Sequence, residues 1–113
     1  LLINNADRKG SHLLFDADHH LWLIDHGICF HTEDKLRTVI WDFVNEPFPQ
    51  ALLDDLHCFR QALMPGTDLF KSLQGLLSNQ EIKALAKRAE HLISIGYFPQ
   101  PDPEERAFPW PLL

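Results

Sequence analysis

Two short polar segments, each built around an aspartate, constrain this chain more than any other feature. Asp7 lies in the segment Asn4–His12, and Asp25 lies in the segment Leu23–Gly27. Apolar residues next to each segment can anchor it to a core. The stretch between the two segments is of the right length for one β-hairpin, so we expect the two carboxylates to lie close together.

The residues between the two aspartates predict the strands of this hairpin. His12–Asp16 predicts the first strand, His20–Asp25 predicts the returning strand, and Asp16–His19 predicts the turn. Aspartate favours turns because its carboxylate accepts hydrogen bonds from nearby backbone N–H groups. The run Leu21–Ile24 is continuously apolar, which is typical of a strand buried on both faces. Further along, Thr38–Phe43 is expected to be extended or irregular.

Three helices are predicted after residue 45. The first spans Gln50–Leu63, where apolar residues recur at helical spacing, and Pro65 and Gly66 follow it. Thr67 is expected to cap the second helix. Ser78 and Glu81 form a capping box at the start of the third, and a glycine closes it at residue 96. The apolar residues assigned to the second helix are Leu69, Leu73, Leu76 and Leu77.

These elements predict a single α+β domain over residues 1–113. Residues 1–45 carry the polar loops and the hairpin, and residues 46–96 form helical support. Residues 97–113 hold five of the eight prolines and cannot form a regular element. We expect this tail to pack along the surface through its aromatic side chains, Phe98, Phe108 and Trp110.

Composition narrows the class of protein. The formal net charge of −6 argues against nucleic-acid binding, which requires a basic surface. No apolar run is long enough to span a membrane, and no signal peptide is visible. Cys29 and Cys58 have no metal-binding spacing and are expected to be reduced, mostly buried thiols. These features predict a cytoplasmic protein with no integral membrane segment.

The residue types of the two polar segments fit phosphoryl transfer. Asp7 can accept or position a hydroxyl proton, and Lys9 can contact the transferred phosphoryl group. Asp25 can bind Mg²⁺ that bridges nucleotide phosphates, and Gly27 is expected to let the backbone turn sharply after it. Phosphoryl transfer requires mainly positioning and charge neutralisation, which these groups can supply.

Longer segments carry a family resemblance. Asn4–Gly10 reads Asn-Asn-Ala-Asp-Arg-Lys-Gly, Ile24–His31 reads Ile-Asp-His-Gly-Ile-Cys-Phe-His, and Lys35–Phe43 includes Thr-Val-Ile-Trp-Asp-Phe. With the Pro-Trp-Pro at Pro109–Pro111, these segments resemble a bacterial group of phosphatidylinositol-kinase-like proteins. More widely, the chain resembles the C-terminal lobe of the atypical kinases, which include phosphatidylinositol 3- and 4-kinases, type II phosphatidylinositol 4-kinases and HipA-like kinases. The resemblance implies a mainly helical kinase-like lobe whose hairpin carries a catalytic loop and a metal loop.

The resemblance also implies roles for individual residues. Asp7 matches the catalytic-loop aspartate, Lys9 a phosphate-contacting lysine, and Asp25 the metal-binding aspartate of an Asp-Phe-Gly-like motif. His12 stands where the family has an asparagine that binds a second metal ion, so it is a candidate metal and cofactor ligand. The implied cofactors are ATP and Mg²⁺, or Mn²⁺, because imidazole is a poorer ligand for Mg²⁺ than oxygen is. The implied acceptor is a hydroxyl of a lipid, a protein or a small molecule.

The resemblance covers one lobe only. The chain has no Gly-rich phosphate loop and no lysine or glutamate of the kinds found in the N-terminal kinase lobe. We therefore interpret it as a fragment that requires an N-terminal lobe or a partner chain, and expect it to be inactive alone. A catalytically inactive pseudokinase or binding module is the alternative, supported by His12 in place of asparagine.

Several neighbouring residues have structural interpretations instead. Asn4 and Asn5 are expected to organise their loop through hydrogen bonds to the backbone, and Arg8 to form either an internal ion pair or a substrate contact. A hydrolase-type transition-metal site is a further alternative, in which His26 and His31 would join Asp7, His12 and Asp25. No fixed-spacing metal motif supports that alternative.

Overall fold

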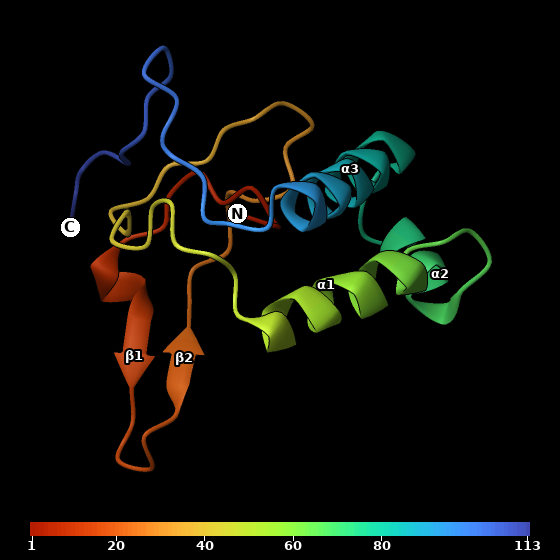
Figure 1. Cartoon of the computed structure of the whole chain (residues 1–113), viewed down its shortest axis with the longest axis horizontal. Coiled ribbons are helices and arrows are strands. Elements are labelled where there is room, and N and C mark those ends of the chain that lie inside the picture. The colour runs from red at the N-terminus through yellow and green to blue at the C-terminus, as the bar shows by residue number, and fades with distance from the viewer.

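A computed structural model describes all 113 residues and contains three α-helices and one two-stranded antiparallel sheet (Figure 1). The α+β class is therefore confirmed, and the assignment to a kinase-like lobe stays a prediction. The elements in chain order are a 3-10 turn at Gly10–His12, β1 Leu13–Phe15, β2 Leu21–Leu23, α1 Gln50–Ala62, α2 Asp68–Gln74 and α3 Asn79–Ile95.

The hairpin forms where it was predicted, but its strands are shorter. Leu13 pairs with Leu23, and Phe15 pairs with Leu21. One turn of 3-10 helix precedes β1 in place of the predicted continuous loop, and it ends at His12. Each strand is three residues long. His12, predicted as the first residue of the first strand, instead belongs to the turn that precedes the sheet.

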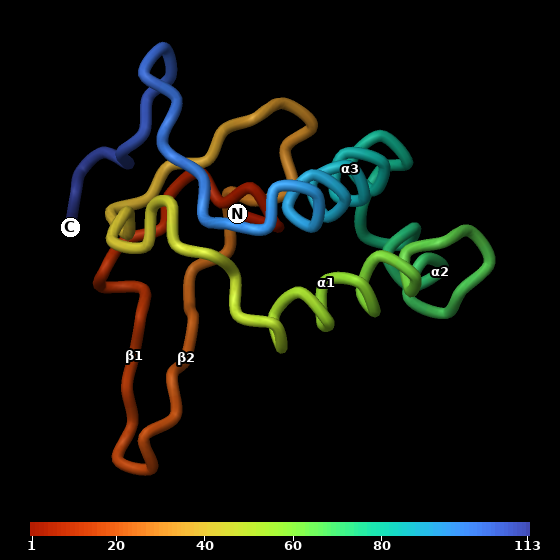
Figure 2. Tube along the Cα trace, in the orientation of Figure 1, coloured from red at the N-terminus to blue at the C-terminus, as the bar shows by residue number.

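The prediction that the second strand is buried on both faces is wrong. Leu21, Trp22 and Leu23 are each more than half exposed. The hairpin projects away from the helices, and no other element lies against its outer half (Figures 1 and 2). A continuous apolar run indicates burial only if another layer covers the sheet, and here none does.

Asp16 holds the hairpin turn together. One carboxylate oxygen accepts hydrogen bonds from the backbone N–H groups of Asp18 (3.0 Å) and His20 (2.9 Å), and the other accepts from Nε1 of Trp22 (2.8 Å). The bond from Trp22 and then the bonds from the backbone hold the pKa of Asp16 below its ordinary value of 3.8.

This lowered pKa predicts acid-induced loosening of the hairpin. Because the pKa in the folded state lies below the unfolded value, the contribution of Asp16 to stability is present above pH 3.8 and is lost as the pH falls through the folded pKa. We expect the NMR signal of the Trp22 indole N–H to shift with a midpoint below pH 3.8. In Asp16→Asn this transition should be absent. A midpoint at or above 3.8 would contradict the assignment.

The helices form a small three-helix layer. In Figure 1, α1 runs towards α2, and α3 returns alongside α1. Phe48, Leu56 and Leu92 form the core cluster between them. The remaining buried apolar residues of this layer are Leu63, Ile82, Leu85 and Ala89.

The predicted starts of α2 and α3 and the predicted end of α3 are confirmed by their caps, whereas α2 ends at Gln74, before the predicted Leu76 and Leu77. The side chain of Thr67 accepts a hydrogen bond from the backbone N–H of Phe70 at 3.3 Å. Ser78 and Glu81 form the reciprocal capping box, with bonds of 3.2 and 2.9 Å. Gly96 closes α3 at φ +70°, a conformation that glycine adopts without steric penalty.

The predicted apolar faces are only partly buried. Leu52 on α1 is 41% exposed, and Leu76, which lies after the end of α2, is 81% exposed. Cys58 is also exposed on α1, so the prediction of two buried thiols is wrong for it, although both cysteines are free.

Irregular segments connect the hairpin to the helices. Residues 38–43 form no strand, as predicted, and Thr38 makes an isolated parallel bridge with Arg8. The backbone N–H of Thr38 also donates to the carbonyl of Ala107 in the tail (3.0 Å). These bonds hold the first residues of the chain, residues 37–39 and the tail together.

The packing predicted for the tail is correct for one aromatic residue. Phe98 packs edge-on against Phe48, with 4.6 Å between ring centroids. Phe108 and Trp110 are 50% and 77% exposed and therefore do not anchor the tail. None of the three helices has the length and apolar character that a membrane span requires.

Candidate active site

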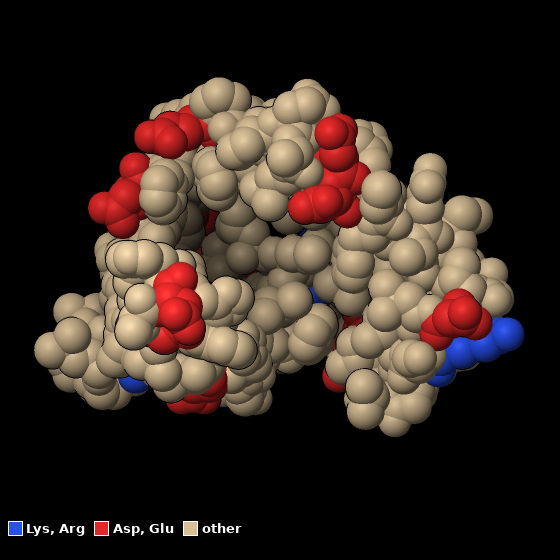
Figure 3. Space-filling model, turned by 90° about the horizontal axis from the view of Figure 1, so that it is seen from below, with Lys and Arg blue, Asp and Glu red and all other residues tan.

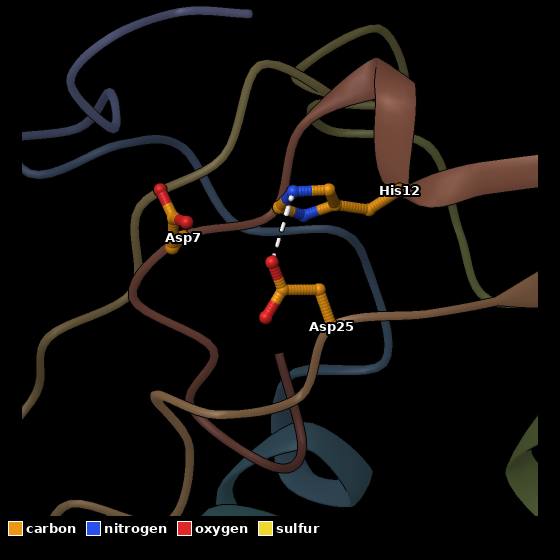
Figure 4. A group of neighbouring side chains, drawn as sticks. All are labelled: Asp7, His12 and Asp25. Atoms are coloured by element: carbon orange, nitrogen blue, oxygen red, sulfur yellow. Dashed lines mark ion pairs between the residues drawn. The ribbon is translucent and has the colours of Figure 1, made fainter.

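Three side chains predicted from the sequence meet at the base of the hairpin. Asp7, His12 and Asp25 each offer one possible ligand atom, and these atoms all lie within 4.8 Å of one another. Figure 4 shows the three side chains around one small space. Nε2 of His12 lies 3.4 Å from Oδ2 of Asp25. The structure thus brings together one catalytic candidate, Asp7, and both metal candidates.

Each member of this group comes from a different local structure. Asp7 lies in the loop before the 3-10 turn, His12 is the last residue of that turn, and Asp25 follows β2. The backbone N–H of Ile24 donates to the carbonyl of His12 at 3.0 Å, which continues the hairpin pairing to its base. The hairpin therefore places His12 opposite Ile24, and Asp25 follows directly, so residues 12 and 25 lie close together, as the spacing in the sequence suggests.

Asp25 itself adopts an unusual backbone conformation. Its φ is +60°, in the left-handed region, which costs about 1 kcal/mol or more for a residue other than glycine. The backbone bends at Gly27, as predicted, but Gly27 does not have positive φ, and the left-handed residue of this segment is Asp25. The side chain of Asp25 is also 60% exposed, so the expectation of a buried strand end is wrong here as well.

Lys9 lies beside Asp7 and is largely buried. Its Nζ is 3.3 Å from Oδ1 of Asp7, and the side chains are 10% and 26% exposed, respectively. No other carboxylate lies within ion-pair distance of Lys9. A buried ammonium is stable only when it is paired, so Asp7 and Lys9 depend on each other. The ammonium also places a positive charge next to the Asp7 carboxylate.

Arg8 connects the two polar segments through backbone groups. Its Nη1 donates to the carbonyl of Ile24 at 2.9 Å and, more weakly, to that of His12 at 3.4 Å. It makes no ion pair, so the internal ion pair considered from the sequence is wrong. Arg8 is a positioning residue that holds the base of the hairpin. A sequence pattern cannot reveal this role, because carbonyl acceptors exist at every residue.

Asn4 and Asn5 organise the loop, as predicted. Asn4 is 1% exposed and has φ +53°. Its Nδ2 donates to the carbonyls of His31 (3.0 Å) and Glu33 (2.6 Å), and its Oδ1 accepts from the N–H of Lys35 (2.9 Å). Oδ1 of Asn5 accepts from the backbone N–H of Asp7 at 2.8 Å, which fixes the backbone at that aspartate.

His12 retains an unsatisfied polar atom. The residue is 9% exposed, and its Nδ1 is buried without a hydrogen-bond partner. Such an atom is rare in folded proteins and often marks a place where water, an ion or a ligand binds. His26 and His31 do not belong to the group, so the five-residue transition-metal site considered above does not form.

The donor set fits a divalent cation. Two carboxylates and one imidazole can bind Mn²⁺ or Mg²⁺, and the imidazole favours Mn²⁺. Ligands on opposite sides of such an ion are about 4.2 Å apart, given bonds of about 2.1 Å. Small movements of the exposed Asp25 side chain would therefore suffice to bring the donors to ligand distances.

Burial raises the pKa of the neighbouring Cys29 thiol, with a smaller contribution from Asp25, so Cys29 stays protonated.

Comparison with known proteins shows one related sequence of unequal length. The chain is 40% identical over 111 residues to Protein Rv2133c of Mycobacterium tuberculosis (strain ATCC 25618 / H37Rv), a match that covers 98% of the chain. The chain spans 39% of the length of that relative, whose name states no activity. No family model matches the chain, and no solved structure matches it.

Proposed function

We propose that this chain is the catalytic part of an ATP-dependent phosphotransferase of the atypical-kinase type, corresponding to its C-terminal lobe. The observation that carries the proposal is the convergence of Asp7, His12 and Asp25 within 4.8 Å at the base of one hairpin. A second supporting observation is the ion pair of Lys9 with Asp7. The sequence motifs predict functional roles for the same two aspartates and the lysine.

In this proposal each residue has one role. Asp25 and His12 would hold the divalent metal, which when bound neutralises charge on the nucleotide phosphates. Asp7 accepts the proton of the acceptor hydroxyl or orients that hydroxyl for attack. Lys9 stabilises negative charge on the transferred γ-phosphoryl group. The acceptor is a hydroxyl of a lipid, a protein or a small molecule.

The remainder of the nucleotide site would come from elsewhere. In kinases of this type a second lobe supplies the glycine-rich loop and a phosphate-binding lysine. The match to 39% of a longer relative is consistent with a catalytic unit that extends beyond these 113 residues. We therefore propose that transfer requires the full protein, as a cytoplasmic enzyme, and that this chain contributes the catalytic and metal loops.

A pseudokinase is the second candidate, and His12 favours it. The histidine replaces the asparagine that the family uses as a metal ligand, and it donates nitrogen where Mg²⁺ prefers oxygen. A pseudokinase would bind nucleotide without turnover. Incubation of the full protein with ATP and Mn²⁺, followed by measurement of phosphoryl transfer or ATP hydrolysis, distinguishes the two candidates.

Metal binding tests the site itself. We expect Mn²⁺ to bind this chain and, with ATP, the full protein, and we expect Asp25→Ala to weaken Mn²⁺ binding by about 10- to 100-fold. The fold should survive, because the Asp25 side chain is 60% exposed and the penalty for alanine at φ +60° is only about 1 kcal/mol. Electron paramagnetic resonance of free Mn²⁺ provides the measurement.

A matched control is available on the same hairpin. Asp18 is an exposed aspartate in the turn and lies outside the metal group. Asp18→Ala should leave Mn²⁺ affinity unchanged. Equal affinity of Asp25→Ala and the unsubstituted protein would remove Asp25 from the site and, with it, the main support for the proposed function.

A further inference from the structure

A cavity lies apart from the candidate active site. It has a volume of about 750 Å³ and is lined by residues 32–41, by α3 and by residues 99–107. These segments lie in the upper part of the molecule in Figure 1. None of Asp7, Lys9, His12 and Asp25 lines it. The volume is in the range of small-molecule binding sites in proteins.

This cavity concentrates the positive charge of the protein. Six of the ten Lys and Arg residues of the chain line it, together with three acidic residues, so its lining has a net charge of +3. With a total of −6, the remainder of the chain has a net charge of −9. The surface seen from below accordingly shows several Asp and Glu side chains and few Lys and Arg atoms (Figure 3). The six basic residues are Lys35, Arg37, Lys83, Lys87, Arg88 and Arg106.

Most of these cations have no acidic partner. Only Lys35 forms an ion pair, with Glu33 at 3.3 Å, and the other five have no carboxylate within 4.0 Å. The chain has 16 acidic residues, so the lack of partners does not reflect a shortage of them. Unpaired cations in a concave site repel one another, and an anion that binds among them relieves this repulsion.

The same cavity collects unsatisfied hydrogen-bond donors. Five buried side-chain polar atoms in the protein have no partner, and three of them belong to residues that line this cavity: Nε of Arg37, Nε1 of Trp41 and Nη2 of Arg88. The other two guanidinium donors of Arg88 bond the carbonyls of Leu2 (2.9 Å) and His31 (3.0 Å), which holds that side chain in place. Burial lowers the pKa of Arg88, consistent with a guanidinium held away from water.

We propose that this cavity binds a small soluble molecule that carries two or more phosphate groups. Five unpaired cations require several negative charges, and the guanidinium groups present the planar donor pairs that phosphate oxygens accept. Three donors of the lining residues also lack a partner within the protein. A nucleic acid is disfavoured, because the net charge of −9 outside the cavity would repel a long polyanion. This site is separate from the proposed phosphotransfer site and does not depend on it.

Calorimetry with inorganic tripolyphosphate tests the proposal. The titration is run in EDTA, so that a metal-dependent site cannot contribute. We expect saturable binding with one ligand per chain, and affinity that falls as salt is added. The double variant Lys83→Gln/Lys87→Gln should weaken the affinity by at least about tenfold. Both lysines are exposed and lie one turn apart on α3, so the helix should persist.

Three controls decide the outcome. Lys71→Gln removes an exposed lysine on α2 outside the cavity and should leave affinity unchanged; an equal loss there would show non-specific attraction and overturn the proposal. Loss of tripolyphosphate binding in Asp25→Asn would move the ligand to the phosphotransfer site and also overturn it. Binding to vesicles that contain phosphorylated lipid, without binding to tripolyphosphate, would overturn the assignment to a soluble ligand.

Discussion

Asn4→Ala is expected to destabilise the protein by about 3–5 kcal/mol, the largest loss of folding stability that we predict for a single substitution. The side chain is 1% exposed and makes three hydrogen bonds to backbone groups of residues 31–35. Alanine would leave the carbonyl of Glu33 and the N–H of Lys35 without a partner, at about 1–3 kcal/mol each where water cannot replace it, whereas the carbonyl of His31 keeps its bond from Arg88. Alanine is also disfavoured at φ +53°, which adds about 1 kcal/mol.

The consequence should extend to the candidate active site. Asn4 is three residues before Asp7, and its bonds hold the loop after Asp25 against the first polar segment. Urea unfolding monitored by circular dichroism measures the loss of stability. The total stability of a domain is only about 5–15 kcal/mol, so the loss could leave the variant unfolded. Absence of a cooperative unfolding transition would then also agree with the prediction.

Asn45 provides the matched control. It is an exposed asparagine with φ +67°, so Asn45→Ala has the same backbone penalty, and it makes one side-chain bond, to Gln100 at 3.2 Å. We expect Asn45→Ala to cost about 1 kcal/mol. Similar losses in the two variants would mean that left-handed backbone, and not the buried hydrogen bonds, dominates at Asn4.

The features that were predictable are those determined by neighbouring residues. The caps at Thr67, Ser78 and Gly96 each involve bonds within about four residues, so the local sequence contains all the necessary information. The same holds for the hairpin turn at Asp16, whose carboxylate bonds residues two, four and six positions later. The sequence also predicted that Asn4 organises its loop through hydrogen bonds to the backbone. It did not predict that the bonded backbone groups belong to residues 31–35.

The failures concern tertiary environment. Whether Leu21–Leu23 is buried depends on a covering layer, and a pattern along one strand contains no information about such a layer. The same reason explains why Asp25 is exposed. Arg8 bonds the carbonyl of a residue 16 positions away, and its side chain could equally have met a carboxylate. Long-range partners of this kind require the folded chain.

The convergence of Asp7, His12 and Asp25 is an intermediate case. The hairpin spacing indicates that residues 12 and 25 lie close together at its base, and the pairing of Leu13 with Leu23 agrees with this, because it places His12 opposite Ile24, next to Asp25. The position of Asp7 is different, because it depends on the 3-10 turn that no sequence pattern indicated. The position of Asp7 beside the other two side chains therefore supports its membership of the group independently of the hairpin pattern.

Asp7→Asn is expected to reduce phosphoryl transfer by the full protein by about 10²–10⁴-fold, because an amide cannot accept the hydroxyl proton. The same change removes the only ionic partner of Lys9, whose side chain is 10% exposed. We expect a loss of stability of about 1–3 kcal/mol, smaller than for a fully buried pair because Asp7 is 26% exposed. Lower transfer alone would therefore not separate a catalytic role from a structural one.

A double variant separates the two effects. Asp7→Asn/Lys9→Met removes both charges and places an apolar side chain of similar length in the buried position, which should recover most of the stability. If Asp7 and Lys9 act in catalysis, transfer stays at or below the level of Asp7→Asn although the fold is restored. Transfer that returns together with stability would mean that the pair only maintains the loop, and both residues would then leave the mechanism. Initial rates at saturating ATP, with urea unfolding of the same preparations, distinguish these results.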